Sequence, residues 1–295
     1  MLVACPVTAM DAVTFRAQYL EAAKQLEDAY SHCQVHTTTL TTNDKDDKWF
    51  TTTFRFMFSG ENVRCEHEFE DAAEKYGRTI AGTPAVNFMI LSKNDKQPVL
   101  EQVDRSSLGY HQAQQRVGSR ADTALKAFTL FGTRITERLQ SSHFTILKVE
   151  EIGDLIKVHF QNDEDTVSHR GWFAVLPKRN WVLDSWEAVL SKPGQDYSWR
   201  KDGKANYTDG QPVPHLAGIE SHSYHADRTD TESTTVDLLK FEASPESEFM
   251  LSRYGYDDRL GTSTNFFWSL PFLLIVCGAC CLLAVAGIRY RKRLS

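Results

Sequence analysis

The chain has 295 residues, of which 39 are acidic and 33 are basic, and its formal net charge is −6. Four of the basic residues lie in the last seven positions, so the remainder of the chain is more acidic still. An acidic chain of this kind disfavours a nucleic-acid partner and electrostatic adhesion to anionic lipid. About 250 residues suffice for a sizeable core in one domain or two.

The first nine residues predict the remnant of a signal peptide. Val7-Thr8-Ala9 has small residues where a cleavage site needs them, and Leu2-Val3-Ala4-Cys5 resembles a lipobox. The segment has no basic n-region, so we expect an upstream extension that carries one. The alternative is that Met1 is the true start and that the protein is tail-anchored, with its large domain in the cytoplasm.

An amphipathic helix is predicted from Asp11 to Cys33, because apolar residues recur there at steps of three and four. The cap is expected near Thr8 or Asp11. The stripe consists of Phe15, Tyr19, Ala22, Leu26, Ala29 and Cys33.

The pattern then changes to the period of two that is typical of strands. Short polar turns separate these strands, and connections this short imply antiparallel neighbours. The first group of predicted strands is 34–42, 49–58, 63–69, 85–91 and 97–103. After a helical region at 123–139, interrupted at Gly132, the second group is 144–150, 155–160, 171–176, 181–190, 197–199, 219–225 and 233–241. The sum predicts an α+β fold: a large curved antiparallel sheet with an N-terminal helix and a central helical insertion.

The apolar run from Phe266 to Ile288 contains no charged residue. As a helix it would rise roughly 34 Å, enough to cross a bilayer core of about 30 Å. A basic tail follows, formed by Arg289, Arg291, Lys292 and Arg293. Basic residues resist translocation, so we expect one C-terminal transmembrane helix, a cytoplasmic tail and an extracytoplasmic domain.

Several segments resemble those of a known family. The stretch DAVTFRAQYLEAAKQLEDAYSHCQV, followed by Thr-rich strands and FRFMFSGENVRCE, resembles the start of outer-membrane lipoprotein carrier (LolA-like) domains. The segments FTLFGTRITERL and GWFAVLPKRNWVLDSWE are similar to parts of bacterial exported proteins of unassigned function. The most specific match is Ser244 to Tyr256, a PxxEFxLxxYG stretch that in those proteins leads to a C-terminal span. The resemblance implies a half-barrel of about eleven antiparallel strands with helices in its concavity, a fold that is often able to shelter lipid.

The candidate ligand-binding residues are Phe50, Phe54, Phe56 and Phe58, which share one face of a predicted strand. Such a stripe either lines a lipid groove or seals the sheet against a helix as ordinary core. Cys33 and Cys65 are the candidate disulfide, because they remain once Cys5 is removed and the three cysteines of the apolar run are set aside.

The sequence offers no catalytic constellation, so we expect no enzyme, no metal and no cofactor. It contains no G-x-S-x-G, Walker loop, dinucleotide fingerprint or H-E-x-x-H motif. Cys65 and His67 would share a strand face as zinc ligands do, but no further ligands with metal-site spacing lie nearby.

We therefore predict an extracytoplasmic binding module at the inner membrane, single-pass, with the bilayer and a lipid or acylated ligand as partners. The alternative is a protein-interaction or envelope-sensing module without lipid transport. The expected divisions are 1–9 (signal remnant), 10–243 (LolA-like domain), 244–265 (juxtamembrane segment), 266–288 (span) and 289–295 (tail).

Overall fold

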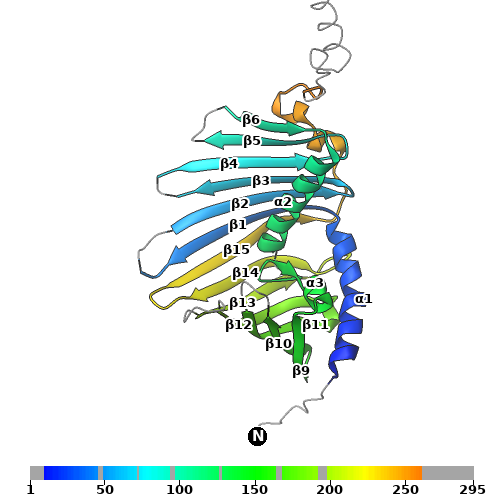
Figure 1. Cartoon of the computed structure of the whole chain (residues 1–295), viewed down its shortest axis with the longest axis vertical. Coiled ribbons are helices and arrows are strands. Elements are labelled where there is room, and N and C mark those ends of the chain that lie inside the picture. The colour runs from blue at the N-terminus through cyan, green and yellow to red at the C-terminus, as the bar shows by residue number, and fades with distance from the viewer. Residues whose placement is uncertain are drawn as a thin grey trace, which may run out of the picture.

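The computed structural model describes residues 10–45, 49–71, 73–93, 97–125, 128–163, 168–191 and 198–260. In these ranges thirteen strands form one antiparallel sheet, in the order β6-β5-β4-β3-β2-β1-β15-β14-β13-β12-β11-β10-β9. Figure 1 shows this ladder of strands, with helix α1 at one end and the hairpin tips at the other.

The sheet and the elements beside it have the following bounds. The strands of the first half are β1 (His32–Asn43), β2 (Trp49–Ser59), β3 (Asn62–Glu70), β4 (Lys75–Gly82), β5 (Asn87–Lys93) and β6 (Val99–Asp104). Those of the second half are β9 (Phe144–Ile152), β10 (Leu155–Asp163), β11 (Ser168–Leu176), β12 (Val182–Ser191), β13 (Ser198–Thr208), β14 (His215–Tyr224) and β15 (Thr229–Lys240). The remaining elements are helices α1 (Ala12–Tyr30), α2 (Ser107–Leu125) and α3 (Ile135–Gln140), the hairpin β7 (Thr129–Leu130) and β8 (Thr133–Arg134), and the 3₁₀ turns η1 (Pro177–Arg179), η2 (Glu246–Phe249) and η3 (Leu251–Tyr254).

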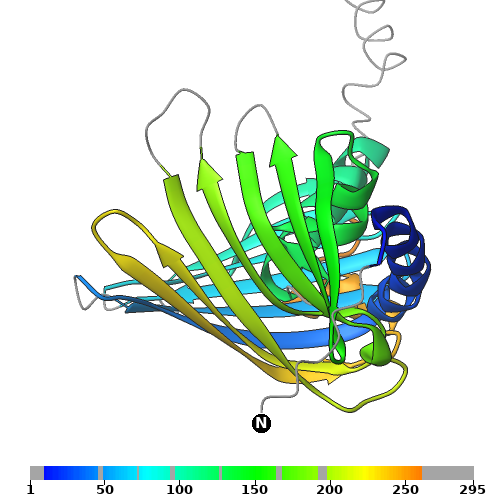
Figure 2. The same cartoon turned by 90° about the horizontal axis from the view of Figure 1, so that it is seen from below.

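The two halves of the sheet are each built from consecutive antiparallel strands and meet at one pairing, β1 with β15. That ladder runs from Gln34 opposite Lys240 to Asn43 opposite Asp230. Twist and curvature bend the sheet into an open trough, which Figure 2 shows along its length. The concave face of this trough receives the three helices.

Helix α1 begins where the sequence predicts. Its N-cap is Asp11, whose carboxylate accepts hydrogen bonds from the backbone N–H groups of Val13 and Thr14, both at 2.9 Å. The buried face then packs on the second half of the sheet, where the Phe15 ring lies 6.1 Å from that of Phe173. The residues buried along α1 are Phe15, Tyr19, Ala23, Leu26 and Tyr30.

Helix α2 covers one end of strands β2 to β5 on the concave face. A Cβ on Gly82 would lie 3.0 Å from the Cβ of Ala113, so glycine lets the helix approach the sheet closely. The buried side of α2 continues through Val117 and Ala121, which are small enough for this close packing. The other end of the same strands is not covered by the helix, as Figure 1 shows.

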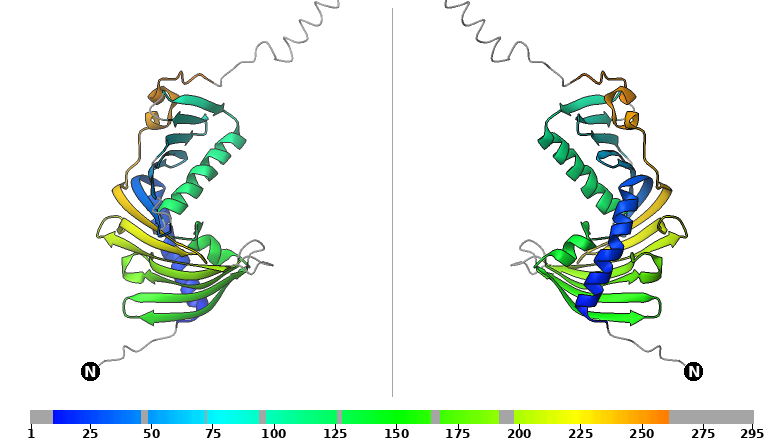
Figure 3. Two further views of the ribbon diagram at one scale, coloured as in Figure 1. Left: turned by 90° about the vertical axis from the view of Figure 1, so that its left-hand side faces the viewer. Right: turned by 90° about the vertical axis from the view of Figure 1, so that its right-hand side faces the viewer.

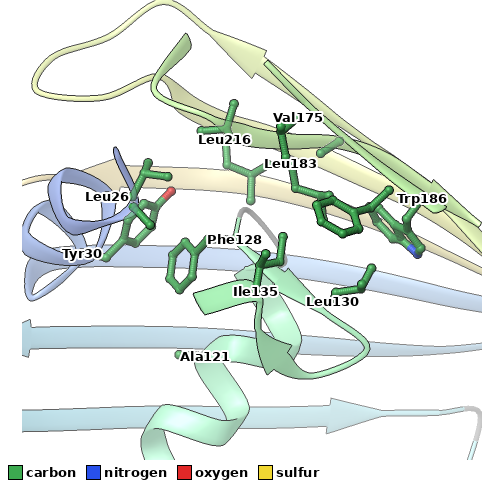
Figure 4. Close-up of a cluster of buried hydrophobic side chains, with 14 of the residues drawn as sticks. Leu26, Tyr30, Ala121, Phe128, Leu130, Ile135, Val175, Leu183, Trp186 and Leu216 are labelled. Carbon is green, nitrogen blue, oxygen red and sulfur yellow. The ribbon is translucent and has the colours of Figure 1, made fainter. Parts of the chain in front are cut away.

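The segment between α2 and β9 fills the concavity of the second half. Hairpin β7–β8 turns at Phe131 and Gly132, both with positive φ, and inserts Leu130 between the sheet and the helices. Figure 4 shows this cluster, in which Phe128, Leu130 and Ile135 face side chains of the sheet such as Val175 and Trp186. Arg138, itself buried, donates to the Leu130 carbonyl at 2.9 Å and holds the hairpin in place. This half of the trough is therefore packed with the protein's own side chains.

Residues 244–260, which we call the C-terminal strap, lie on the convex face of β3 to β6. Phe249 and Leu251 are fully buried there, Leu251 in a second small core with Phe88 and Ile90. In Figure 3 the strap and α2 occupy opposite sides of the same strands. The segment expected to lead into a membrane span is thus a packed part of the domain.

The structure corrects the expected fold class. The sheet has thirteen strands and few helices rather than the half-barrel of about eleven strands that the resemblance implied. We expected one transmembrane helix as well, but no helix in the described ranges is long and apolar enough to cross a membrane. The run from Phe266 to Ile288, the basic tail and the signal remnant at 1–9 all lie outside those ranges.

Candidate functional site

A continuous layer of rings lies on the concave face of β2, β3 and β4. We call it the aromatic floor; its members are Phe50, Phe54, His67, Phe69 and Tyr76. The rings of Phe54 and His67 stack at 4.6 Å with an interplanar angle of 7°. Phe69 links the Phe50 ring at 5.2 Å to the Tyr76 ring at 5.1 Å. Ring-to-ring contact therefore runs unbroken across three strands.

Strand alternation places the floor on this face. Phe54 pairs with His67 across β2 and β3, and His67 pairs with Arg78 across β3 and β4, so successive partners share one side of the sheet. Trp49, the neighbour of Phe50, points to the opposite face and is 47% exposed. The floor residues are half-buried or, for Tyr76, exposed. A half-buried apolar surface of this kind can receive an apolar ligand.

The four predicted ligand residues do not share one environment. Phe50 and Phe54 belong to the floor, whereas Phe56 is 1% exposed and forms part of the main core. Phe58 lines a cavity of about 240 Å³ that lies between the end of α1, the β2–β3 turn and α2. The stripe therefore divides into core, cavity wall and floor, and its role in binding stays a prediction.

This cavity, which shares no lining residue with the floor, has both apolar and polar walls. Tyr30, Val63, Phe58 and Phe128 line it, and Arg134 reaches its edge. Its volume is below the roughly 300–1,000 Å³ that is usual for pockets of drug-sized ligands, so it would accommodate only the end of a longer ligand. A buried hydroxyl, that of Tyr30, lacks a hydrogen-bond partner in the described structure.

His67 is the titratable group of the floor. Burial, together with the positive charges of Arg120 and Arg78, lowers its pKa to about 4. The imidazole is therefore neutral at pH 7 and behaves as another ring of the floor. Sequence alternation already placed His67 and Phe69 on one face, but the stacking on β2 and the neighbouring guanidinium groups depend on register, which the sequence does not specify.

The candidate metal ligands are not assembled into a site. Within the part of the chain that the structure describes, no three His, Cys, Asp or Glu side chains come together as a metal site would require. His222 lies 3.0 Å from a carboxylate oxygen of Asp202, and His225 lies 3.1 Å from one of Asp230. Each histidine thus has its own carboxylate partner.

Cys33 and Cys65 are free, buried thiols in the structure and do not form the predicted disulfide. Cys33 on β1 faces Phe58 and Cys65 on β3 faces Phe56, so strand β2 lies between them. Two strand spacings alone place their Cα atoms at least about 9–10 Å apart, beyond the roughly 7 Å that a disulfide spans. Burial raises the pKa of both thiols to about 12.

No protein-family model and no curated protein matches the chain. It is similar to the structure of a DUF1329 family protein from Desulfovibrio piger, at 10% identity and a TM-score of 0.42, over 83% of this chain and all of the other. It is also similar to a putative outer membrane lipoprotein-sorting protein domain from Vibrio parahaemolyticus, at 13% identity and a TM-score of 0.38, over 82% of this chain and all of the other. A third similarity, to MucB in complex with MucA(peri), has 8% identity and a TM-score of 0.17, over 77% of this chain and 99% of the other. These similarities are distant, and the architecture rests on the strand order given above.

Proposed function

We propose that this protein is a binding module that holds an acyl chain against the aromatic floor. One observation carries the proposal: five rings joined by a series of contacts form a half-buried apolar surface on the concave face, while the other half of the trough is filled. Aromatic side chains contribute large apolar contact areas with little conformational freedom to lose. An unbranched apolar chain lying along β2 would contact Phe50 and Phe54 in succession.

Native mass spectrometry of the full-length protein tests this proposal. We expect the wild-type protein to carry co-purifying acyl mass, and Phe50→Ser to lose most of it. Trp49→Ser is the matched control, because it changes the adjacent residue on the opposite face of the same strand. Circular dichroism establishes that both variants keep the sheet.

Three results would count against the proposal. The first is a wild-type protein with no acyl mass that also takes up none from added dodecanol. The second is equal loss of ligand in Phe50→Ser and Trp49→Ser, which would place binding elsewhere. The third is a protein recovered in place of lipid after cross-linking in cells, which would favour a protein-interaction module.

A further inference from the structure

Two guanidinium groups converge beside His67 on the concave face. Arg78 lies directly opposite His67 in the β3–β4 ladder. Arg120 comes from α2, which packs on the same strands, and its side chain contacts the Cys65 thiol one pair along β3. Both positive charges act on His67, so they lie at the border between the aromatic floor and the helix.

Neither guanidinium group has a carboxylate partner among the described residues, and the Nη1 atom of Arg120 is buried without any hydrogen-bond partner. The convex face of the same strands is different. There Arg55 reaches Glu66 at 3.4 Å, and Arg64 reaches Glu248 at 2.9 Å. The acidic residues of β3 all alternate to that convex face. A buried N–H group without a hydrogen-bond partner is unfavourable, so the arrangement favours an anion from outside the chain.

We propose that Arg78 and Arg120 bind the carboxylate of a free fatty acid whose chain lies on the aromatic floor. This inference rests on the proposed function and adds the ligand's charge and head group to it. A carboxylate is planar and matches the two parallel N–H groups of a guanidinium. The aromatic floor is a single layer of five rings, which suits one chain, whereas a phosphodiester lipid would bring a further head-group substituent and commonly a second chain. Neutral His67 leaves both guanidinium groups free to act on the ligand.

Isothermal titration calorimetry on the delipidated full-length protein tests the head group. Dodecanoate and dodecanol share one chain length and differ in charge, and dodecyl phosphate supplies the other anionic head. We expect the wild-type protein to bind dodecanoate more tightly than dodecanol, with an affinity for dodecanoate that falls as salt rises. Arg120→Gln and Arg78→Gln should each weaken dodecanoate binding about ten- to a hundredfold, which is the range for a hydrogen bond to a charged group. Both variants should leave dodecanol binding within about twofold of wild type, because the apolar floor is unchanged.

Arg55→Gln is the matched control, since it removes a guanidinium from the convex face of β2 and should change neither affinity. Equal binding of dodecanoate and dodecanol, unaffected by Arg120→Gln and Arg78→Gln, would overturn the head-group assignment while leaving the acyl-binding proposal in place. Failure of all three probes to bind would overturn both proposals. Tighter binding of dodecyl phosphate than of dodecanoate through the same two arginines would replace the carboxylate with a phosphate and overturn the fatty acid.

Discussion

Arg64 on β3 and Glu248 in the C-terminal strap form an ion pair across 184 residues of sequence, with Arg64 Nη1 2.9 Å from a carboxylate oxygen of Glu248. Arg64 is 1% exposed and also donates to the Glu248 carbonyl. The strap is further held by Tyr254, whose hydroxyl donates to Glu66 at 2.9 Å. The C-terminal strap, which contains the most specific motif of the sequence, is therefore fixed to the convex face by these contacts.

Replacing Arg64 with methionine should loosen the attachment of the C-terminal strap. The change removes the ion pair between Arg64 and Glu248, which keeps Arg253 as a partner at 2.7 Å, so we expect a cost of about 1.5–3 kcal/mol, the range for a hydrogen bond to a charged group. We expect a matching drop in the free energy of unfolding by urea and faster proteolysis within 244–260. Arg55→Met, which removes an exposed arginine on the same face, should cost less than about 1 kcal/mol. Equal protease resistance of the C-terminal strap in both variants would contradict the role of Arg64 in holding the strap on the sheet.

The pH dependence of stability should report on His67. Its pKa of about 4 in the folded protein lies below the ordinary histidine value of 6.5, so the unfolded chain binds the extra proton first as pH falls. The groups facing it are the positive Arg78 and Arg120, the rings of Phe54 and Tyr76, and the neutral Cys65 thiol. The contribution of His67 is therefore complete above pH 6.5 and is lost between pH 6.5 and 4, by about 3 kcal/mol at most.

His67→Phe should keep the ring stack and flatten the fall in melting temperature over this window. The measurement is the difference between variant and wild type across a pH series, because carboxylates elsewhere add their own acid dependence to both proteins. His111→Gln, an exposed change on α2, is the control and should follow wild type. A variant that loses stability in parallel with wild type from pH 6.5 to 4 would show that His67 titrates normally.

The two buried thiols should be inert in the folded protein. Their pKa of about 12 leaves almost no thiolate at pH 8, and the thiolate is the reactive form. We expect iodoacetamide to leave Cys33 and Cys65 unmodified under native conditions and to label both in guanidinium chloride without reductant, as read by peptide mass mapping. A cross-linked Cys33–Cys65 peptide in the non-reduced digest would contradict the structure.

Two glycine substitutions should act in opposite directions. A Cβ on Gly171 in β11 would lie 2.0 Å from the backbone oxygen of Glu187 on β12, so Gly171→Ala should force the strands apart and cost about 2–3 kcal/mol. Gly118 in α2 has nothing within 4 Å of such a Cβ, so Gly118→Ala should raise stability by about 0.5–1 kcal/mol. Urea denaturation compares the two, and destabilisation by Gly118→Ala would mean that α2 packs more tightly at this position than the structure has it.

The sequence predicted most of the strands because alternation is strong where one face is buried. It missed β4, whose residues Gly77 and Gly82 interrupt the pattern where Ser92 and Ala113 need the space. The pair Asp202-Gly203 is typical of a turn but lies inside β13. Gly203 is there because a Cβ would lie 2.1 Å from the Trp186 ring. Close approach between elements, rather than chain reversal, explains these glycines.

The central helical region was predicted at 123–139, but the long helix of this region, α2, lies earlier in the chain, at Ser107–Leu125. The apolar residues Phe128, Leu130, Ile135 and Leu139 have helical spacing, but they come from a loop, a hairpin and α3. The real long helix, α2, presents mostly small side chains to the sheet and so gives a weak periodic signal. The same limit applies to the site. Phe50 and Phe54 stand out in one strand, whereas the partners Tyr76, Arg78 and Arg120 are brought to them only by strand register and by the position of α2.

The pairing between the first strand, β1, and the last strand, β15, also constrains the order in which the domain can fold. Thr38 on β1 donates a hydrogen bond to Asp237 on β15, 199 positions later, while the other strand pairs of the sheet join consecutive strands. During synthesis the side of β1 that pairs with β15 therefore keeps unpaired backbone groups until nearly the whole domain has left the ribosome. Pairings between distant parts of a chain form slowly, so we expect β1 and β15 to pair late in folding. The exposed edge of β1 is therefore covered only when β15 pairs with it.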